Sequence, residues 1–262
     1  MNPYTNFAVA SYSFHGLLNI GAIDIFGYLE TVRYRYGLNT ADIWNGYIKS
    51  YDDRFSKMLK QGLDERGLTV VNLCCDQAHP WDDDPDIRSK NEDIAWKCLE
   101  LAEVIGAKTI RMDAGVREDH FSDEQLDYVA HKFRAYCRRA ASFGAKMCTE
   151  NHWGATRSLE DLKKLIAAVN EKNFGLLLHL GNWQTEDPAQ RDRNDLEMIS
   201  HAVHMHIDFQ HCAEADRVLL PLQQKGYSGC WTIESHLSTN EYANVAYQLA
   251  NVRRVISPMM YK

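Results

Sequence analysis

Residues 145–180 read AKMCTENHWGATRSLEDLKKLIAAVNEKNFGLLLHL. The stretch begins and ends with a short apolar run, and between them apolar residues recur at three- and four-residue spacing, which predicts a strand, a helix and a second strand. Ser158 is a candidate N-cap for the helix, and the acidic residues that follow it complement the positive end of the helix dipole. The stretch is therefore typical of one unit of a parallel α/β fold.

The same alternation of apolar runs and amphipathic stretches extends through the rest of the chain. Eight strands, each followed by a helix, close a (β/α)₈ barrel, and 262 residues is close to the usual length of one such barrel. We therefore expect a single TIM-barrel domain of the α/β class over residues 1–262. The expected strands are FAVASYS (7–13), TADIW (40–44), LTVVNLCC (68–75), AKTIRMD (107–113), AKMCTEN (145–151), FGLLLHL (174–180), AVHMHID (202–208) and GCWTIES (229–235).

The longest polar segment between a strand and a helix is AHPWDDDPDIRSK, residues 78–90. It follows the third expected strand, so we expect a loop that covers the mouth of the barrel. The next helix is expected over residues 91–107, where Gly106 supplies a left-handed residue that ends it.

Composition and charge exclude several classes of protein. The chain has 29 Lys and Arg against 36 Asp and Glu, a net charge of −7, which argues against a nucleic-acid partner. The sequence lacks a signal-peptide pattern and an apolar run of about 18 residues, so we expect a soluble cytoplasmic protein that does not contact a membrane. Seven cysteines without CxxC spacing indicate reduced, mostly structural thiols.

Polar residues end four consecutive expected strands, where catalytic groups of such barrels lie. Glu150 ends the fifth strand, His179 the sixth and Glu234 the eighth, while His204 and His206 both lie in the seventh. Carboxylate oxygen and imidazole nitrogen are ligands for Mn²⁺, Fe²⁺, Co²⁺, Ni²⁺ or Zn²⁺. The sequence therefore predicts a site for one divalent cation.

The segments TENHWG (149–154), LLLHLGNW (176–183), VHMHID (203–208) and GYSGCWTIES (226–235) resemble successive strand motifs of the xylose isomerase-like barrels, the sugar phosphate isomerase and epimerase superfamily. The resemblance implies a metal ion, with Mn²⁺ preferred. Its ligands would be Glu150, His179, His206 and Glu234.

The chain departs from the family pattern at two of these positions. His179 stands where the family usually has Asp, which lowers the negative charge of the site and favours Fe²⁺ or Zn²⁺. Asp208 stands where the family commonly has a substrate-binding Lys, which favours a neutral sugar over a phosphate. His204 stays an alternative to His206, because both residues share one parity along the strand.

The resemblance implies an isomerase or epimerase that acts on a sugar or related polyhydroxy carbonyl compound, with Glu150 and Glu234 as the acid/base pair. One alternative is a lyase or dehydratase that eliminates a group from a keto-sugar, an inosose or a 3-keto-glycoside. Another is a non-catalytic sugar-binding barrel subunit.

Further polar and aromatic residues follow other strands and are candidates for contact with the substrate. Arg111 has a structural alternative, as the internal partner of a carboxylate. Trp44 and Trp183 have one too, as side chains that pack the mouth of the barrel. We also expect a homo-oligomer, with the apolar stretch YANVAYQLANVRRVISPMM (242–260) in part of the interface; the alternative is that this last helix only closes the barrel against the first strand. The substrate-binding candidates are His15, His79, Arg111, His152, Trp183 and Asp208, with Asp42, Trp44, Asp76 and Asp113 beside them.

Overall fold

In the computed structural model, which describes residues 7–257, eight strands form one parallel sheet in the order β1-β8-β7-β6-β5-β4-β3-β2. An isolated parallel bridge between Ala10 and Asp42 joins the first and second strands and nearly closes the ring. The expected barrel of eight strands is confirmed, although the first expected strand, 7–13, ends at Val9, and a 3-10 helix follows over Ser11–Phe14. The strands are β1 (Phe7–Val9), β2 (Thr40–Trp44), β3 (Thr69–Cys75), β4 (Thr109–Met112), β5 (Lys146–Glu150), β6 (Phe174–His179), β7 (Ala202–Ile207) and β8 (Trp231–Ile233).

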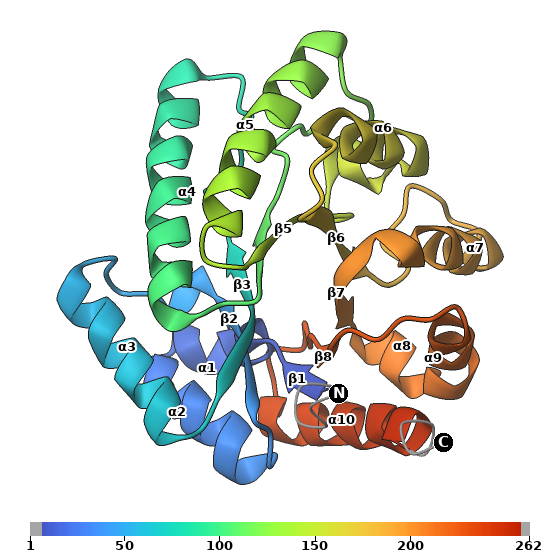
Figure 1. Ribbon diagram of the computed structural model, residues 1–262. Helices are drawn as coiled ribbons and strands as arrows, with labels where there is room; N and C mark the ends of the chain where they lie inside the picture. The colour runs from blue at the N-terminus through green and yellow to red at the C-terminus, as the bar shows by residue number, and fades with distance from the viewer. Residues whose placement is uncertain (1–6, 258–262) are drawn as a thin grey trace.

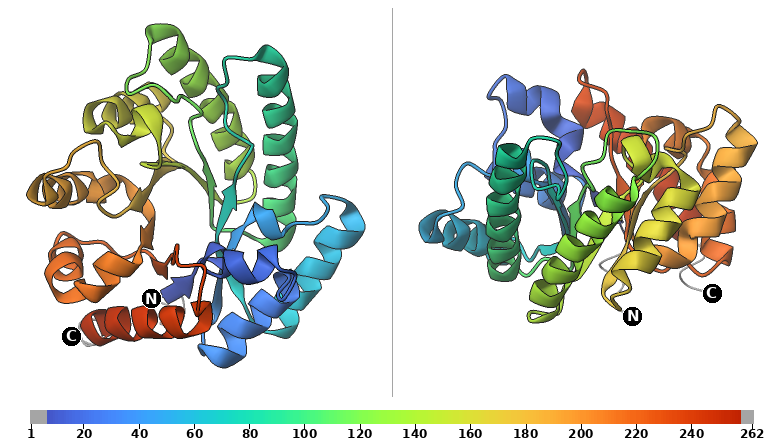
Figure 2. Two further views of the ribbon diagram at one scale, coloured as in Figure 1. Left: turned by 180° about the vertical axis from the view of Figure 1, so that it is seen from behind. Right: turned by 90° about the horizontal axis from the view of Figure 1, so that it is seen from above.

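Helices surround the sheet on its outer side, as Figure 1 shows, and the two views of Figure 2 show the same ring from behind and from above. No helix within residues 7–257 combines the length and the apolarity that crossing a membrane requires. The helices are α1 (His15–Asn19), α2 (Ile25–Glu30), α3 (Asp53–Glu65), α4 (Pro85–Ile105), α5 (Asp123–Ala141), α6 (Leu159–Val169), α7 (Pro188–Met198), α8 (Phe209–Ala213), α9 (Ala215–Gln224) and α10 (Glu241–Ile256).

Local sequence signals set the ends of α4 and α6. The Ser158 side chain accepts a hydrogen bond from the Asp161 N–H at the start of α6, as expected. Gly106 ends α4 with a φ of 71°. The expectation of a loop over residues 78–90 is wrong in its second half, because α4 already begins at Pro85. Asp84 caps this helix, and Pro85 suits the first turn, where its missing N–H is not needed.

The inside of the barrel contains an apolar part and a polar part. Two small clusters fill its apolar part, one made of Ala8, Val71 and Cys230 and the other of Cys74, Cys148 and Leu177. All seven cysteines are free and buried, which agrees with small apolar residues in reduced form. The polar part lies toward the carboxyl ends of the strands, where the candidate site is found.

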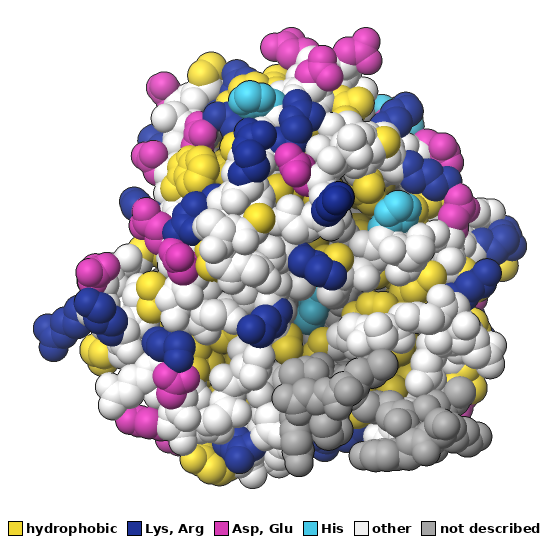
Figure 3. All heavy atoms as spheres, viewed as in Figure 1, with side chains coloured by type: hydrophobic (Ala, Val, Ile, Leu, Met, Phe, Trp, Pro, Cys, Tyr) yellow, Lys and Arg dark blue, Asp and Glu magenta, His cyan; other side chains and the backbone are white. Residues whose placement is uncertain are grey.

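On the outer surface, basic and acidic side chains are interspersed over the face shown in Figure 3. That face therefore carries charges of both signs.

Candidate metal centre and active site

The structure brings four of the sequence-predicted residues together at the carboxyl ends of neighbouring strands. Glu150 ends β5 and His179 ends β6, while His206 pairs in register with His179 from β7. Glu234 directly follows β8. All four side chains are buried, and one donor atom from each lies within 4.8 Å of the others. We call Glu150, His179, His206 and Glu234 the four-donor group.

His179 lies between the two glutamates of the four-donor group. Its Nδ1 is 3.0 Å from Glu150 Oε1 and 3.5 Å from Glu234 Oε2. Glu234 Oε2 is also 3.2 Å from His206 Nδ1. Oxygen and nitrogen donors therefore converge on one small volume.

The donor chemistry and the buried atoms of the four-donor group fit a divalent cation. Among the residues that the structure describes, His206 Nδ1 and Glu150 Oε2 are buried without a hydrogen-bond partner. Glu150 Oε2 is held instead by an ion pair with Arg111 Nε at 2.9 Å. Two carboxylates and two imidazoles suit a borderline divalent ion such as Mn²⁺, Fe²⁺ or Zn²⁺.

His204 lies outside the four-donor group, and its ring contacts Asp42. Its Nε2 lies 2.6 Å from Asp42 Oδ2 and 3.0 Å from Thr232 Oγ1. His206 Nε2 reaches the same Asp42 oxygen at 3.0 Å. Asp42, His204 and His206 thus form a second group of donor atoms that lie within 4.8 Å of one another.

Buried carboxylates give the site a negative field. Burial disfavours a charged His206, but the carboxylates of Glu234 and Asp42 outweigh this effect and raise its pKa well above the usual range. In turn, the histidines hold the pKa of Glu234 well below its usual range despite its burial. A field that favours protonated imidazole also attracts a divalent cation.

Arg111 is a buried cation that pairs with carboxylates on three sides. Its guanidinium lies 2.8 Å from Asp76, 3.1 Å from Asp113 and 2.9 Å from Glu150. Burial would raise the pKa of Glu150, but Arg111 and His152 lower it. The structure thus realises the alternative that Arg111 is an internal ion-pair partner, and both glutamates of the four-donor group stay ionised.

A cavity of about 120 Å³ opens beside the four-donor group. Its wall is partly aromatic, since the Tyr12 ring lies 5.1 Å from that of Trp44 and 5.3 Å from that of His236. Tyr12 and His236 were not among the sequence candidates, although their positions just after β1 and β8 mark the mouth of the barrel. The lining residues are Ala10, Tyr12, Asp42, Trp44, Cys74, Asp76, Arg111, Glu150, His152, Glu234 and His236.

Four of the expected substrate contacts do not line this cavity. The Trp183 side chain is fully buried and donates to Asp195 at 2.7 Å, which agrees with the alternative that it is a packing residue. Asp208 caps α8 and binds His211. His15 stacks on the lining residue Tyr12 without lining the cavity itself, and His79 packs edge-on against Trp153.

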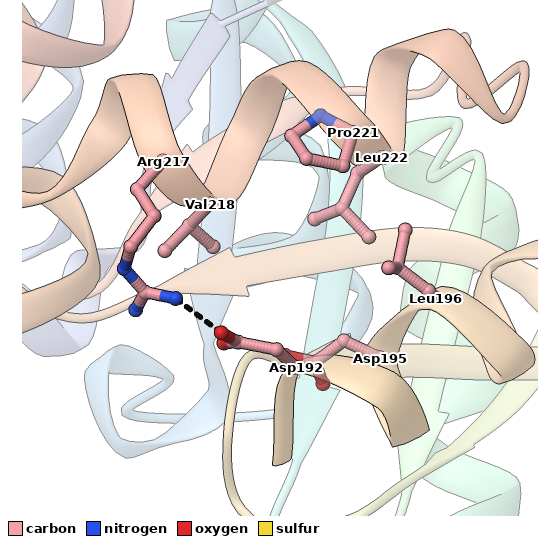
Figure 4. Close-up of a pocket in the computed structure, with 7 residues that line it drawn as sticks. All are labelled: Asp192, Asp195, Leu196, Arg217, Val218, Pro221 and Leu222. Atoms are coloured by element: carbon pink, nitrogen blue, oxygen red, sulfur yellow. Dashed lines mark hydrogen bonds and ion pairs between the residues drawn. The ribbon is translucent and has the colours of Figure 1, made fainter. Parts of the chain in front are cut away.

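Another cavity, of about 150 Å³, lies in the outer layer between α7 and α9 (Figure 4). Asp192 of α7 and Arg217 of α9 form an ion pair on one side of it, while Leu196 and Val218 contribute apolar side chains. It is lined by these two helices and not by strand ends, so it is separate from the four-donor group.

A closed parallel barrel with a carboxylate and histidine group at the carboxyl ends of its strands defines the class of this protein. Its family is shown by the model described as "Xylose isomerase-like TIM barrel", which matches residues 34–250, so the chain belongs to that family. The resemblance seen in the strand motifs is confirmed. A comparison with curated proteins finds no match.

Solved structures of the same fold include proteins that carry different names. One is a xylose isomerase domain protein from Planctomyces limnophilus, with 15% identity, coverage of 98% of this chain and 100% of that chain, and a TM-score of 0.72. Another is the 3-keto-D-glucoside 4-epimerase from E. coli, with 17% identity, coverage of 95% of this chain and 99% of that chain, and a TM-score of 0.75.

A third similar structure is a probable 3-DHS dehydratase from Bacillus anthracis. It has 14% identity, coverage of 95% of this chain and 97% of that chain, and a TM-score of 0.69. At such identities the likeness shows the fold. Epimerases and a dehydratase are thus both found among proteins of this fold.

Proposed function

We propose that this protein is a metal-dependent isomerase or epimerase that acts on a sugar or related polyhydroxy carbonyl compound through an enediolate. The observation that carries the proposal is the convergence of Glu150 and Glu234 with two histidines beside a cavity. Family membership and the epimerases of the same fold support it.

The proposed mechanism assigns proton transfer to the two glutamates. Arg111 lowers the pKa of Glu150, and a bound cation would likewise favour the ionised form of Glu234, so either carboxylate can accept a proton from carbon. A divalent cation, with Mn²⁺ preferred, would supply Lewis acidity that stabilises negative charge on the substrate oxygens. Arg111, which is itself held by Asp76 and Asp113, keeps the Glu150 carboxylate in place during the transfer.

The charge of the cavity favours a neutral substrate. Four of its lining residues are carboxylates, namely Asp42, Asp76, Glu150 and Glu234. The cationic lining groups are fewer: Arg111, and the histidines His152 and His236, whose pKa values are raised. A phosphate or carboxylate group on the substrate would therefore meet a negative field. An unphosphorylated sugar, with one apolar face against Tyr12 and Trp44, suits the cavity better.

A lyase that acts by elimination is the second candidate. The same enediolate can expel a group from the neighbouring carbon, and a probable dehydratase shares this fold. The aromatic wall favours this reading where a keto-glycoside carries an aglycone that stacks on it.

Two measurements test the proposal. Elemental analysis of the purified protein should find about one divalent cation per chain. Incubation with a panel of ketoses, inososes and 3-keto-glycosides in D₂O should move deuterium onto the carbon next to the carbonyl, as seen by NMR. A new stereoisomer supports epimerisation, and a released group supports elimination. A protein without stoichiometric cation and without exchange on any compound would be a non-catalytic barrel.

A further inference from the structure

The Asp42 carboxylate lies on the floor of the cavity and contacts both histidines of β7. Its Oδ2 accepts hydrogen bonds from His206 Nε2 at 3.0 Å and from His204 Nε2 at 2.6 Å. Its Oδ1 accepts a bond from Asn72 Nδ2 at 3.0 Å. The Asp42 side chain is fully buried, so these contacts are not shared with bulk water.

The backbone around Asp42 holds this carboxylate firmly. The register between β2 and β3 shifts at Ala41 and Asp42, an irregularity that redirects side chains in a strand. Asp42 also forms the bridge to Ala10 that closes the ring. The Tyr28 hydroxyl accepts from the Asp42 N–H at 2.9 Å and donates to the Val9 carbonyl at 2.7 Å, which ties the same two strands together.

A hydrogen bond at one imidazole nitrogen decides what the other can do. When the proton of neutral His206 is on Nε2 and donated to Asp42, the lone pair is on Nδ1. This Nδ1 faces Glu234 and is buried without a hydrogen-bond partner within the described part of the chain. Asp42 thus leaves the correct nitrogen of His206 free to join the four-donor group.

We propose that Asp42 is a positioning residue for the metal centre, which fixes the Nε2–H tautomer and the ring orientation of His206. The inference rests on the proposed function. It adds to the proposed metal centre a residue that does not bind the cation but holds one of its ligands. Carboxylates that bind the far nitrogen of a ligating histidine commonly set its basicity and orientation. His204 donates to the same oxygen and helps to hold Asp42, but its ring contributes no atom to the four-donor group.

The first test measures Mn²⁺ binding by calorimetry with the metal-free full-length protein. Asp42→Asn keeps the size of the side chain but removes its charge, and we expect it to weaken Mn²⁺ binding by about 10- to 100-fold. Asp161→Asn is the matched control, because Asp161 is also buried but lies in α6, bound to His120. It should bind Mn²⁺ as the wild type does. A folded Asp42→Asn variant with wild-type affinity would overturn the inference.

A second test uses the wild-type protein and does not depend on the folding of a variant. In ¹⁵N-histidine-labelled protein loaded with Zn²⁺, the His206 signals, assigned by their loss in His206→Gln, should show a protonated Nε2 and a deprotonated Nδ1. A deprotonated Nε2 would overturn the positioning role. If instead the wild type binds neither Mn²⁺ nor Zn²⁺, the proposed metal centre itself fails and Asp42 has no ligand to position.

Discussion

Glu150 and Glu234 each have two proposed tasks, to bind the cation and to move a proton, and a Gln substitution separates them. Gln keeps the shape and one oxygen donor but cannot act as a base. We therefore expect Glu150→Gln and Glu234→Gln variants that retain the metal to lose about 10²- to 10⁴-fold in turnover. Substrate binding should be affected less. Steady-state kinetics beside metal analysis measure both effects.

Glu241→Gln provides a control for the same chemical change. Glu241 is a buried carboxylate near the mouth of the barrel, but it accepts bonds from the backbone of Gly16 and Leu17 and lies outside the four-donor group. Its substitution should change stability more than turnover. Full activity in a metal-bearing Glu150→Gln variant would rule out the two-glutamate mechanism.

The two histidines of β7 can be told apart by their metal content. We expect His206→Ala to lose the bound cation, because its Nδ1 belongs to the four-donor group. His204→Ala should retain the cation, since His204 Nε2 is directed at Asp42. Elemental analysis of both variants checks this. Loss of metal in His204→Ala alone would move the site to the group of Asp42, His204 and His206.

Sequence reasoning at the residue scale could predict groups that end strands but not contacts across the barrel. The four-donor group is recognisable in the sequence because its residues lie at or near the ends of strands, and the structure brings them together. The link from Asp42 to His206 depends on the closure of the ring and on a register shift, neither of which is visible in local sequence. For Trp183 the sequence leaves both substrate contact and packing open, because a position near a strand end does not determine which way the ring turns.

At the scale of elements, the turn that joins β6 to α7 is fastened by one buried carboxylate. Asp195 of α7 accepts bonds from the Gly181 N–H and from Trp183 Nε1. Gly181 has a φ of 70°, and a Cβ there would lie 2.7 Å from the His211 ring. This turn directly follows His179, so its anchoring also fixes the end of β6. The sequence pattern predicted both elements but not the carboxylate between them.

The stability of this anchor should depend on pH. Burial raises the pKa of Asp195 from 3.8 to about 7, even though the bonds from Trp183 and Gly181 lower it. Between about pH 4 and about pH 7 the folded protein therefore holds a proton that the unfolded chain has lost, and stability falls as pH rises. The Asn side chain of Asp195→Asn cannot ionise, so this variant should not show the loss in free energy of unfolding, which is on the order of 4 kcal/mol in the wild type.

Urea unfolding at several pH values measures the effect as the difference in free energy of unfolding between Asp195→Asn and the wild type. The difference should grow with pH across this window and level off above it. Asp161→Asn is the control. Burial raises the pKa of the Asp161 carboxyl, but hydrogen bonds to His120 and its other neighbours lower it by more, so its pKa lies below the usual value. An Asp195→Asn variant with the same pH dependence as the wild type would contradict the expectation.

For the whole molecule, the regular alternation of strands and helices was enough to predict the barrel, because each unit repeats the same local pattern. The pattern places the start of α4 too late, because the acidic residues before Pro85 resemble a loop, although Asp84 and Pro85 together form a helix-start signal. The apolar stretch 242–260 was expected in an interface. Its last three residues lie outside the described ones, and much of α10 packs inward, with Val245, Leu249 and Val252 in the core.

If the protein is a homo-oligomer, the exposed side chains of α10 are the part of this helix that can lie in the subunit interface. Tyr247 is 51% exposed and packs against Phe209, which is 37% exposed, with 5.8 Å between their rings. We expect this aromatic pair to lie in the subunit interface, so Tyr247→Glu should shift the mass measured by light scattering toward the 30.1 kDa monomer. Ile20→Glu is the control, because Ile20 is 77% exposed on a different element and should leave the mass unchanged. A wild-type mass near 30.1 kDa at all concentrations would show that α10 serves only to close the barrel.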